Sequence, residues 1–390
     1  MTDRALLRGD WNFPTQIRFG PGRIAELADA CAMLGMQRPL MVTDPGLASL
    51  PMVIAVTAKI GTAGLSTGLF SDVRGNPVGQ DVTEGVAAYR DGGHDGVIAF
   101  GGGSAIDAAK SIALMVGQRR PLWDFEDIGD NWRRIDPEGM VPVVAVPTTA
   151  GTGSEVGRAS VIIDEASDTK KIIFHPGMMP KIVIADPELT VGLPPDMTAA
   201  TGMDALAHCL EALCAPGFHP LADGVALEGV RLVHDWLPLA YADGTDLVAR
   251  ANMLVAASMG ATAFQKGLGA VHAISHPVGA IYGVHHGLAN AIVLPYVLQF
   301  NRDAIEVPMQ KLALFLGLAN QSFDGVMDWL FELRRTLGIP RTLGEVGVPE
   351  KEAARVAAAA AIDPTAATNP VPLGLANLEV LFLDCVRGKL

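Results

Sequence analysis

The chain has 390 residues, a net charge of −13 at neutral pH and 49% hydrophobic residues. This length exceeds one ordinary hydrophobic core and suits two domains of about 150 to 200 residues, each able to bury a sizeable interior. The acidic balance argues against nucleic acid and anionic membranes as partners, since both would repel it.

The cysteines and the first residues bear on the cell compartment. The four cysteines show no CxxC spacing, and residues 1–10 carry charges where a secretory signal has an apolar core. We therefore expect reduced thiols and a cytoplasmic protein.

Short apolar runs alternate with helical stretches through the first half of the chain. Extended chain ending in a turn is expected at residues 12–22. The expected strands are residues 39–43, 64–70, 96–100, 141–146 and 181–185, and the expected helices are residues 53–59, 82–89 and 105–116. This alternation predicts a parallel sheet with crossover helices, so residues 1–188 form an α/β domain.

The second half of the chain changes character after residue 187. Long segments rich in Ala and Leu show helical periodicity, which predicts an all-helical domain at residues 189–390. Residues 267–300 contain no charged side chain, a length that could span a membrane. Two prolines, Asn290 and the histidines argue against a span and favour a buried helical core.

A glycine turn follows the strand expected at residues 96–100. Gly101, Gly102, Gly103 and Ser104 lead directly into a helical stretch. Glycines let the backbone approach an anion, and the free amides at the helix start favour a pyrophosphate. The spacing departs from the usual Rossmann fingerprint, and tight turns use glycine anyway, so dinucleotide binding is one of two interpretations.

An acidic residue, Asp44, ends the strand expected at residues 39–43. Its carboxylate could accept hydrogen bonds from an adenosine ribose and repel a 2′-phosphate, which favours NAD over NADP. The alternative is a cap of the turn at Pro45 and Gly46.

A loop dense in hydroxyls and glycines follows the strand expected at residues 141–146. Thr148, Thr149, Thr152 and Ser154 could donate hydrogen bonds to a nicotinamide, a ribose or a phosphate. The loop lies at the carboxyl end of a strand, where open α/β sheets bind ligands.

One carboxylate and three imidazoles make a candidate metal site: Asp204, His208, His272 and His286. Asp204 and His208 stand four residues apart, which puts both on one helix face. His272 and His276 repeat the spacing, so we expect two ligand-bearing helices. A lone histidine is more often a hydrogen-bonded core residue. Here, however, four of the nine histidines of the chain fall within fifteen residues, 272–286, of an otherwise apolar stretch.

Together these motifs resemble the iron-containing (group III) alcohol dehydrogenase family, which is related in fold to glycerol dehydrogenase and dehydroquinate synthase. The likeness covers nearly the whole chain through the motifs at residues 19–22, 101–104, 147–155, 186–188, 201–204, 272–277 and 286–290. The resemblance implies an amino-terminal nucleotide-binding domain, a carboxyl-terminal helical metal-binding domain, and an active site in the cleft between them. It also implies a dimer or larger homo-oligomer.

The resemblance further implies roles for single residues. Asp204, His208, His272 and His286 would ligate the metal, and His276 would lie near the nicotinamide. Lys170 would contact the cofactor, although the neighbouring Lys171 could take its place.

These residues suggest a hydride transfer between an alcohol and NAD. A divalent ion with one open position would let an alcohol lose its proton near neutral pH. His276, one turn from His272, would relay the proton or orient the substrate; the alternative is a hydrogen bond to a ligand. For His285 a structural use is expected. Spacing permits iron(II), zinc, nickel or manganese, and affinity favours zinc, but the resemblance makes iron(II) the first choice.

The substrate and some rival functions stay open. Lys266 and Arg158 could clamp the carboxylate of a small hydroxy acid or semialdehyde, unless they form ordinary salt bridges such as Arg158 with Glu155. Rivals are a dehydroquinate synthase-like or glycerol dehydrogenase-like enzyme, a non-catalytic metal- or nucleotide-binding protein, and a non-haem iron oxygenase. The glycine turn argues against the last two. The complete pattern of His272, His276, His286 and Gly287 favours simple hydride transfer over a dehydroquinate synthase-like lyase.

Overall fold

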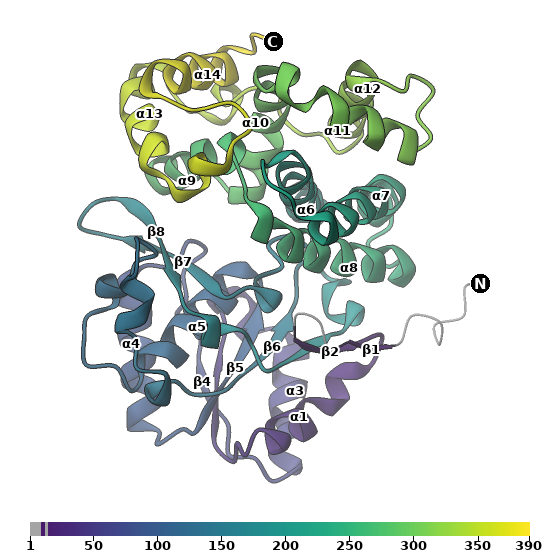
Figure 1. Cartoon of the computed structure of the whole chain (residues 1–390). Coiled ribbons are helices and arrows are strands. Elements are labelled where there is room, and N and C mark those ends of the chain that lie inside the picture. Colours follow the sequence, from purple (N-terminus) through teal and green to yellow (C-terminus); the bar gives the residue numbers. More distant parts are fainter. Residues whose placement is uncertain (1–8, 12–14) are drawn as a thin grey trace. The chain divides into compact units, whose positions relative to one another are not determined.

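The computed structural model describes residues 9–11 and 15–390, which fold into two compact units (Figure 1). The first unit runs as far as Thr149 and resumes at Gly153–Gly192, and the second comprises Ala150–Thr152 and Leu193–Leu390. The sequence predicted one boundary after residue 188 and did not anticipate the three-residue segment. The charged residues 1–8 and residues 12–14 of the expected extended stretch lie outside the described residues.

The first unit is built on a seven-stranded sheet in the order β1-β2-β9-β6-β5-β3-β4. The strands are β1 Gly9–Trp11, β2 Gln16–Phe19, β3 Pro39–Val42, β4 Gly68–Phe70, β5 Gly96–Gly101, β6 Val143–Pro147 and β9 Ile182–Ala185. All pairings are parallel except that of β1 with β2. This confirms the predicted parallel sheet. Strands β3, β5, β6 and β9 are buried along their whole length, as expected for a sheet covered on both faces.

Helices connect these strands. They are α1 Leu27–Met33, α2 Pro45–Ala48, α3 Pro51–Thr62, α4 Gly79–Asp91 and α5 Gly103–Met115. One cluster of buried side chains joins α1 and α3 to the sheet residues Phe100, Val144 and Ile184. Because the sheet supplies this core, the turns after its strands are held in fixed positions.

The order of the strands contains a reversal between β3 and β5. The chain passes from β3 to β4 on one side and then returns to place β5 on the other side of β3. In open α/β sheets, such a switch point leaves a crevice at the carboxyl ends of the strands, where ligands bind.

A separate hairpin was not predicted. Strands β7 Ala159–Asp164 and β8 Thr169–Phe174 pair antiparallel in a sheet of their own. The buried ammonium of Lys110 on α5 holds its start by donating to the carbonyls of Ser154 (3.0 Å) and Ala159. Asp107 accepts from Ser154 Oγ and from the backbone N–H of Val161 (2.9 Å). These contacts fasten the hairpin to α5.

The second unit is helical, which confirms the predicted fold class. Its helices are α6 Pro195–Cys214, α7 Pro220–Ala242, α8 Leu247–Ala263, α9 Ala270–Tyr282, α10 His286–Phe300, α11 Arg302–Phe315, α12 Phe323–Thr336, α13 Ala353–Ile362 and α14 Leu375–Arg387. Helix α6 packs against α7, α8 and α10, and its residues 198–213 are all buried. It therefore forms the centre of this unit.

The described residues also contain short 3-10 helices. They are η2 Arg23–Glu26, η3 Leu122–Phe125, η4 Asn131–Arg134, η5 Pro137–Gly139, η6 Ser154–Val156, η7 Pro176–Met178, η8 Pro187–Thr190, η9 Phe264–Lys266, η10 Gly344–Val346, η11 Glu350–Glu352 and η12 Pro364–Thr368. The last of these, η12, follows α13, and its N-cap residue is Asp363.

Two bulk expectations can be compared with the structure. All four cysteines are free thiols. Among the described residues, one helical stretch, Leu247–Lys266, is long and apolar enough to cross a membrane, but 61% of its apolar 18-residue window is buried inside the structure. Within it, the buried Arg250 donates to Thr198 Oγ1 at 2.7 Å and to the Leu193 carbonyl at 3.1 Å. Packing in a protein core explains the apolarity of this stretch.

Candidate functional site

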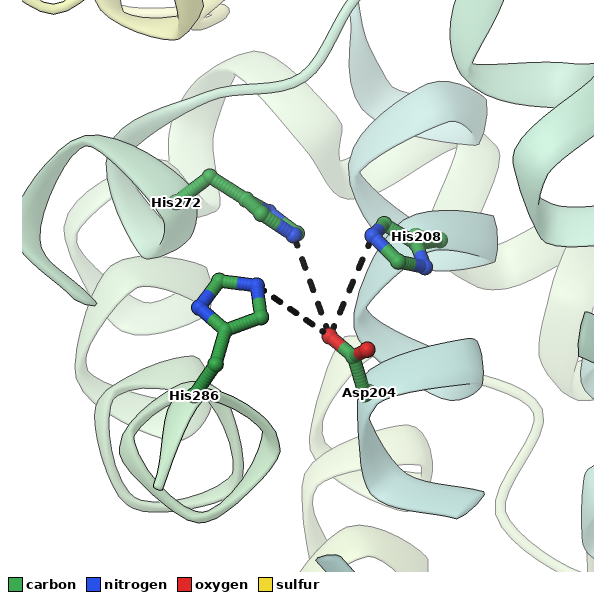
Figure 2. Close-up of side chains that lie close together, drawn as sticks. All are labelled: Asp204, His208, His272 and His286. Atoms are coloured by element: carbon green, nitrogen blue, oxygen red, sulfur yellow. Dashed lines mark ion pairs between the residues drawn. The ribbon is translucent and has the colours of Figure 1, made fainter. Parts of the chain in front are cut away.

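The four predicted metal ligands come together from three helices (Figure 2). Asp204 and His208 lie one turn apart on α6, His272 lies on α9, and His286 is the first residue of α10. The sequence predicted two helices. The third arises because Gly283, with a left-handed φ of 67°, ends α9 before His286 is reached.

The candidate ligand atoms lie within 4.8 Å of one another. Asp204 Oδ1 is 3.8 Å from Nε2 of His208, 3.9 Å from Nε2 of His272 and 3.6 Å from Nε2 of His286, along the dashed lines of Figure 2. Ligands at about 2.1 Å from a tetrahedral ion are separated by roughly 3.4 Å. Small side-chain shifts therefore bring the set to coordinating distance, and its nitrogen and oxygen donors fit a divalent cation.

Burial controls the protonation of these imidazoles. Asp204, His208 and His272 are buried, whereas His286 is 22% exposed. Burial lowers the pKa of His208 to about 4, although the charge of Asp204 opposes the shift. Burial also acts to lower the pKa of His272, but the charge and the hydrogen bond of Glu211 outweigh it, and the net pKa is raised. A neutral imidazole is the form that binds a metal, so His208 is ready at neutral pH.

Two side chains that the sequence did not single out support the ligands. Glu211 accepts a hydrogen bond from Nδ1 of His272 at 2.5 Å. The amide nitrogen of Asn290 donates to Asp204 Oδ1 at 2.7 Å and lies 3.2 Å from Nε2 of both His272 and His286. Helical spacing offered a signal, since Glu211 comes three residues after His208 and Asn290 four after His286.

Two glycines let helices approach the ligands closely. A Cβ on Gly287 would overlap the carbonyl oxygen of Ala200 and lie 3.1 Å from the Cβ of Asp204. A Cβ on Gly260 of α8 would lie 3.0 Å from the Cβ of His208. The backbones of α8 and α10 can therefore reach α6 beside its two ligands.

His276 lies beside the metal set on α9. Its Nδ1 bonds Oδ2 of Asp363 at 2.7 Å, and its ring stacks on His286 with centroids 5.4 Å apart. The side chain of Asp363 is only 7% exposed, and it caps η12 by accepting from the N–H of Thr365 at 2.9 Å. His285 is exposed at the N-cap of α10, and the structural use expected for it stays a prediction.

The candidate cofactor residues of the first unit follow neighbouring strands. Asp44 comes after β3, the glycine turn ends β5, and Thr148 and Thr149 come after β6. A Cβ on Gly102 would lie 3.2 Å from Oγ1 of Thr149, so the glycine turn and the threonine loop are in contact. The structure thus gathers these residues around the switch point of the sheet.

The glycine turn needs its glycines. Gly101 has a φ of 150°, and a Cβ there would lie 2.7 Å from Ala105 Cβ. Gly102 is the N-cap of α5, and Gly103 is its first residue. The hydroxyl of Ser104 donates to the Gly75 carbonyl at 2.6 Å. The backbone amides of this turn lie at the start of α5, and a helix start is a place where an anion can bind.

Asp44 takes the capping role that was its alternative interpretation. Its Oδ1 accepts from the N–H of Leu47 at 3.0 Å at the start of α2. A Cβ on Gly101 would lie 3.8 Å from its Oδ2, so the second oxygen faces the glycine turn.

Two candidate cofactor residues belong to other parts of the chain. Thr152 lies in the segment Ala150–Thr152 of the second unit, and Lys170 lies on β8 opposite Ile163 of β7. Its neighbour Lys171 pairs with Asp164 at 3.0 Å and with Glu126 at 3.5 Å.

The two cations suggested as a carboxylate clamp have other partners. The ammonium of Lys266 pairs with Asp223 at 2.5 Å and donates to the Leu213 carbonyl at 3.2 Å. The guanidinium of Arg158 lies over the ring of Phe174, 5.7 Å from its centroid. Because of these contacts, we assign neither Lys266 nor Arg158 to the recognition of a substrate carboxylate.

Comparison with known proteins identifies the family. Residues 14–187 match iron-containing alcohol dehydrogenase, and residues 198–385 match the Fe-containing alcohol dehydrogenase family, C-terminal. The chain belongs to the iron-containing alcohol dehydrogenase family. It is therefore an oxidoreductase of the alcohol dehydrogenase class, for which NAD and a divalent metal are the expected cofactors.

Three relatives illustrate the family. The 4-hydroxybutyrate dehydrogenase of Cupriavidus necator is 41% identical over 364 residues, which cover 91% of this chain and 94% of that protein. The crystal structure of 1,3-propanediol oxidoreductase has a TM-score of 0.89 at 32% identity and covers 94% of this chain and 96% of its own. Sulfoacetaldehyde reductase from Bifidobacterium kashiwanohense, in complex with NAD⁺, has a TM-score of 0.86 at 30% identity and covers 95% and 97%.

Proposed function

We propose that this member of the iron-containing alcohol dehydrogenase family interconverts a small hydroxy acid and its semialdehyde, with NAD(H) and a bound iron(II). The observation that carries the proposal is the set of four ligand atoms within 4.8 Å of one another, from Asp204, His208, His272 and His286.

The metal would be held by one carboxylate oxygen and three imidazole nitrogens. A divalent cation in such a site supplies a Lewis acid that polarises the oxygen of an alcohol or aldehyde. Burial of Asp204, His208 and His272 excludes water and strengthens the electrostatic interactions there. Iron follows from the name of the family, whereas the donors alone would also accept zinc.

NAD would bind at the switch point of the sheet. The amides at the start of α5 favour the pyrophosphate, and the second oxygen of Asp44 could accept from a ribose hydroxyl. The hydroxyl of Thr149 lies next to the glycine turn, and the backbone N–H of Thr148 donates to the Gly101 carbonyl at 3.0 Å. The hydroxyl of Thr148, Thr152 and Lys170 are further candidate contacts. A carboxylate near the ribose disfavours a 2′-phosphate, which supports NAD over NADP.

His276 would move the proton of the reaction. Oxidation of an alcohol releases a hydride from its carbon, which a bound nicotinamide would accept, and a proton from its oxygen. Asp363 accepts a hydrogen bond at Nδ1 of His276, so Nε2 keeps a lone pair that can take the proton. His276 therefore acts as the general base for oxidation and, once protonated, as the acid for reduction.

An acidic substrate is supported by the names of two relatives. A 4-hydroxybutyrate dehydrogenase acts on a carboxylate, and a sulfoacetaldehyde reductase acts on a sulfonate. We expect kcat/KM for 4-oxobutanoate to exceed that for butanal, which has a methyl group in place of the carboxylate. Equal values for the two aldehydes would contradict the acidic substrate and leave the dehydrogenase intact.

The central experiment combines metal loading with a spectroscopic assay. Metal-free protein is reloaded with iron(II) without oxygen, or with zinc, and NADH absorbance is followed with a panel of alcohols and aldehydes. Turnover should need metal, and Asp204→Ala should bind little metal and lose turnover by at least about 10²-fold. Full turnover without metal would contradict the proposed mechanism.

The compartment and assembly complete the proposal. We propose a cytoplasmic homodimer or larger homo-oligomer, which the resemblance to the family supports. Analytical ultracentrifugation of the purified protein gives the assembly, and fractionation of the host cell gives the compartment.

A further inference from the structure

Glu211 connects two features of α9 through one carboxylate. It lies on α6, three residues after His208, and is only 6% exposed. Its Oε2 bonds Nδ1 of His272 at 2.5 Å, and its Oε1 accepts the backbone N–H of Val271 at 2.7 Å. Both oxygens are therefore used at the start of the helix that carries a metal ligand.

The first contact decides which nitrogen of His272 carries a hydrogen. An ionised carboxylate offers only acceptors, so Nδ1 must donate, and Nε2 then keeps its lone pair. Nε2 is the atom that lies 3.9 Å from Asp204 Oδ1, among the candidate ligands. Asn290 presents its amide nitrogen to the same atom at 3.2 Å, which agrees with an acceptor at Nε2. The lone pair thus points to where a cation would bind.

The second contact supplies a cap that α9 lacks locally. The N-cap residue Gly269 has no side chain, and no side-chain cap is formed there. Instead, Glu211 accepts from Val271, and Asn369 Oδ1 accepts from the N–H of Ala270 at 3.1 Å. A Cβ on Gly269 would lie 3.0 Å from Glu211 Oε1 and 2.7 Å from Asn369 Oδ1, so glycine leaves room for both caps. The carboxylate also gains from the positive end of the helix dipole.

We propose that Glu211 is a positioning residue of the metal centre, which fixes the tautomer of His272 and the start of its helix at the same time. This inference rests on the proposed function, because it concerns the metal that the function requires. Mutation of an outer carboxylate that orients a ligating histidine typically lowers metal affinity about 10–100-fold. We expect an effect of that size here.

The test compares zinc binding to full-length, metal-free wild type and Glu211→Gln. Glutamine keeps the size of the side chain but has one acceptor and one NH₂ group, so it cannot accept from both His272 and Val271. If its NH₂ faces His272, Nδ1 becomes the acceptor and Nε2 takes the hydrogen. The dissociation constant for zinc, measured by competition with a chromogenic chelator, should rise about 10–100-fold.

Asp363→Asn is the matched control. It makes the same carboxylate-to-amide change next to Nδ1 of a histidine on the same helix, but His276 is not among the four ligands. Its zinc affinity should stay close to wild type. Equal affinity in wild type and Glu211→Gln, or equal loss in both variants, overturns the role of Glu211. Absence of zinc binding by the wild type contradicts the proposed function itself.

A measurement on the wild type does not depend on whether a variant folds. Protein labelled with ¹⁵N-histidine is studied by NMR, and the signals of His272 are assigned by their loss in His272→Gln. With zinc bound, and in the neutral ring of the metal-free protein, the hydrogen of His272 should reside on Nδ1. A neutral ring that carries its hydrogen on Nε2 overturns the proposal.

Discussion

Two histidines on one helix are each held by a carboxylate from elsewhere in the chain. Glu211 holds Nδ1 of His272, which belongs to the metal set, and Asp363 holds Nδ1 of His276, which does not. The same type of contact would thus serve two different purposes one helical turn apart. At His272 it would direct a lone pair toward the proposed cation, and at His276 it would leave Nε2 able to exchange a proton.

Asp363→Asn should separate catalysis from metal binding. An amide cannot stabilise a protonated His276, and it can force the hydrogen onto Nε2, so kcat should fall roughly 10²–10⁴-fold while the metal content is retained. Steady-state kinetics and metal analysis give the two readouts. Asp235→Asn is the control, because Asp235 bonds Nδ1 of His234 at 2.7 Å on α7. If both variants keep the wild-type kcat, the role of Asp363 is refuted.

The capping histidine His175 should make the first unit sensitive to mild acid. Its Nδ1 accepts the N–H of Gly177 at 3.0 Å, and burial lowers its pKa below 6.5. The unfolded chain then gains a proton near pH 6.5 that the folded protein gains only at lower pH. The contribution of His175 to the free energy of unfolding is therefore present above pH 6.5 and decreases as the pH falls below it.

His175→Asn tests this pH dependence. Asparagine can cap η7 but does not titrate. Urea unfolding at pH 7.5 and pH 5.5 should show a smaller decrease in stability for the variant than for wild type. An unchanged decrease would show that His175 does not contribute to it.

The sequence predicted the four ligand positions, which the structure brings together, but not the residues that orient them. Asp204 and His208 could be paired because helical spacing puts residues four apart on one face. Glu211 and its partner His272 are 61 residues apart, Asn290 and Asp204 are 86 apart, and Asp363 and His276 are 87 apart. No local pattern reports contacts of that separation, since they depend on how the helices pack.

At the scale of elements, close helix packing places ligands from α6 and α10 side by side. Gly287 is the second residue of α10, directly after His286, and it faces the backbone of α6 at Ala200. Any side chain there must move α10, and the imidazole of His286 moves with it.

Gly287→Ala should therefore weaken both stability and the metal site. Overpacking of this kind costs about 1–3 kcal/mol, and metal affinity should fall because His286 is displaced. Urea unfolding and zinc titration measure the two effects. Gly224→Ala on α7 is the control, because a Cβ there meets nothing within 4 Å and alanine favours a helix. Equal behaviour of the two variants would contradict the packing argument.

Lys110→Met should loosen the attachment of the β7–β8 hairpin to α5. Methionine leaves Asp107 and the carbonyls of Ser154 and Ala159 without the buried ammonium. Breaking a buried ion pair on one side costs about 3–5 kcal/mol. Urea unfolding should show this loss, whereas the exposed Lys59→Met should stay within about 0.5 kcal/mol of wild type. A Lys110→Met protein with the same free energy of unfolding as wild type would refute the role of the ammonium.

The elements of the main sheet were predictable, and the hairpin was not. Strands β3, β5, β6 and β9 appear in the sequence as short apolar runs, because both faces of the sheet are buried. In the hairpin, only alternate residues of β7 are buried, and β8 begins with Thr169, Lys170 and Lys171. Its turn contains no glycine and instead uses Asp168 at a φ of 51°. The usual turn signal is therefore missing.

At the scale of the whole molecule, each proposed cofactor has its own unit. The four candidate metal ligands lie on α6, α9 and α10 of the second unit, whereas Asp44 and the glycine turn lie at the sheet of the first. A ligand that binds only the folded state stabilises the unit that holds it, by about 2.7 kcal/mol at 100 times its dissociation constant.

Removal of the metal should therefore act locally. Chelation should lower the temperature of thermal unfolding and increase hydrogen exchange in α6, α9 and α10, with little change in β3, β5 and β6. NAD added to the metal-free protein should instead protect the first unit. Hydrogen exchange with mass spectrometry resolves these segments. A uniform change across both units would contradict the assignment of separate sites.

The segment Ala150–Thr152 has a consequence for how the protein is made. These residues leave the ribosome before residues 153–192 of the first unit, yet they belong with α6, where Gly151 packs against Thr201. Thr201 follows Gly151 by fifty residues in the sequence, so about fifty further residues must be synthesised before this contact can form. A gene divided after codon 192 would yield a helical fragment without this segment, so we expect it to be less soluble than the intact product.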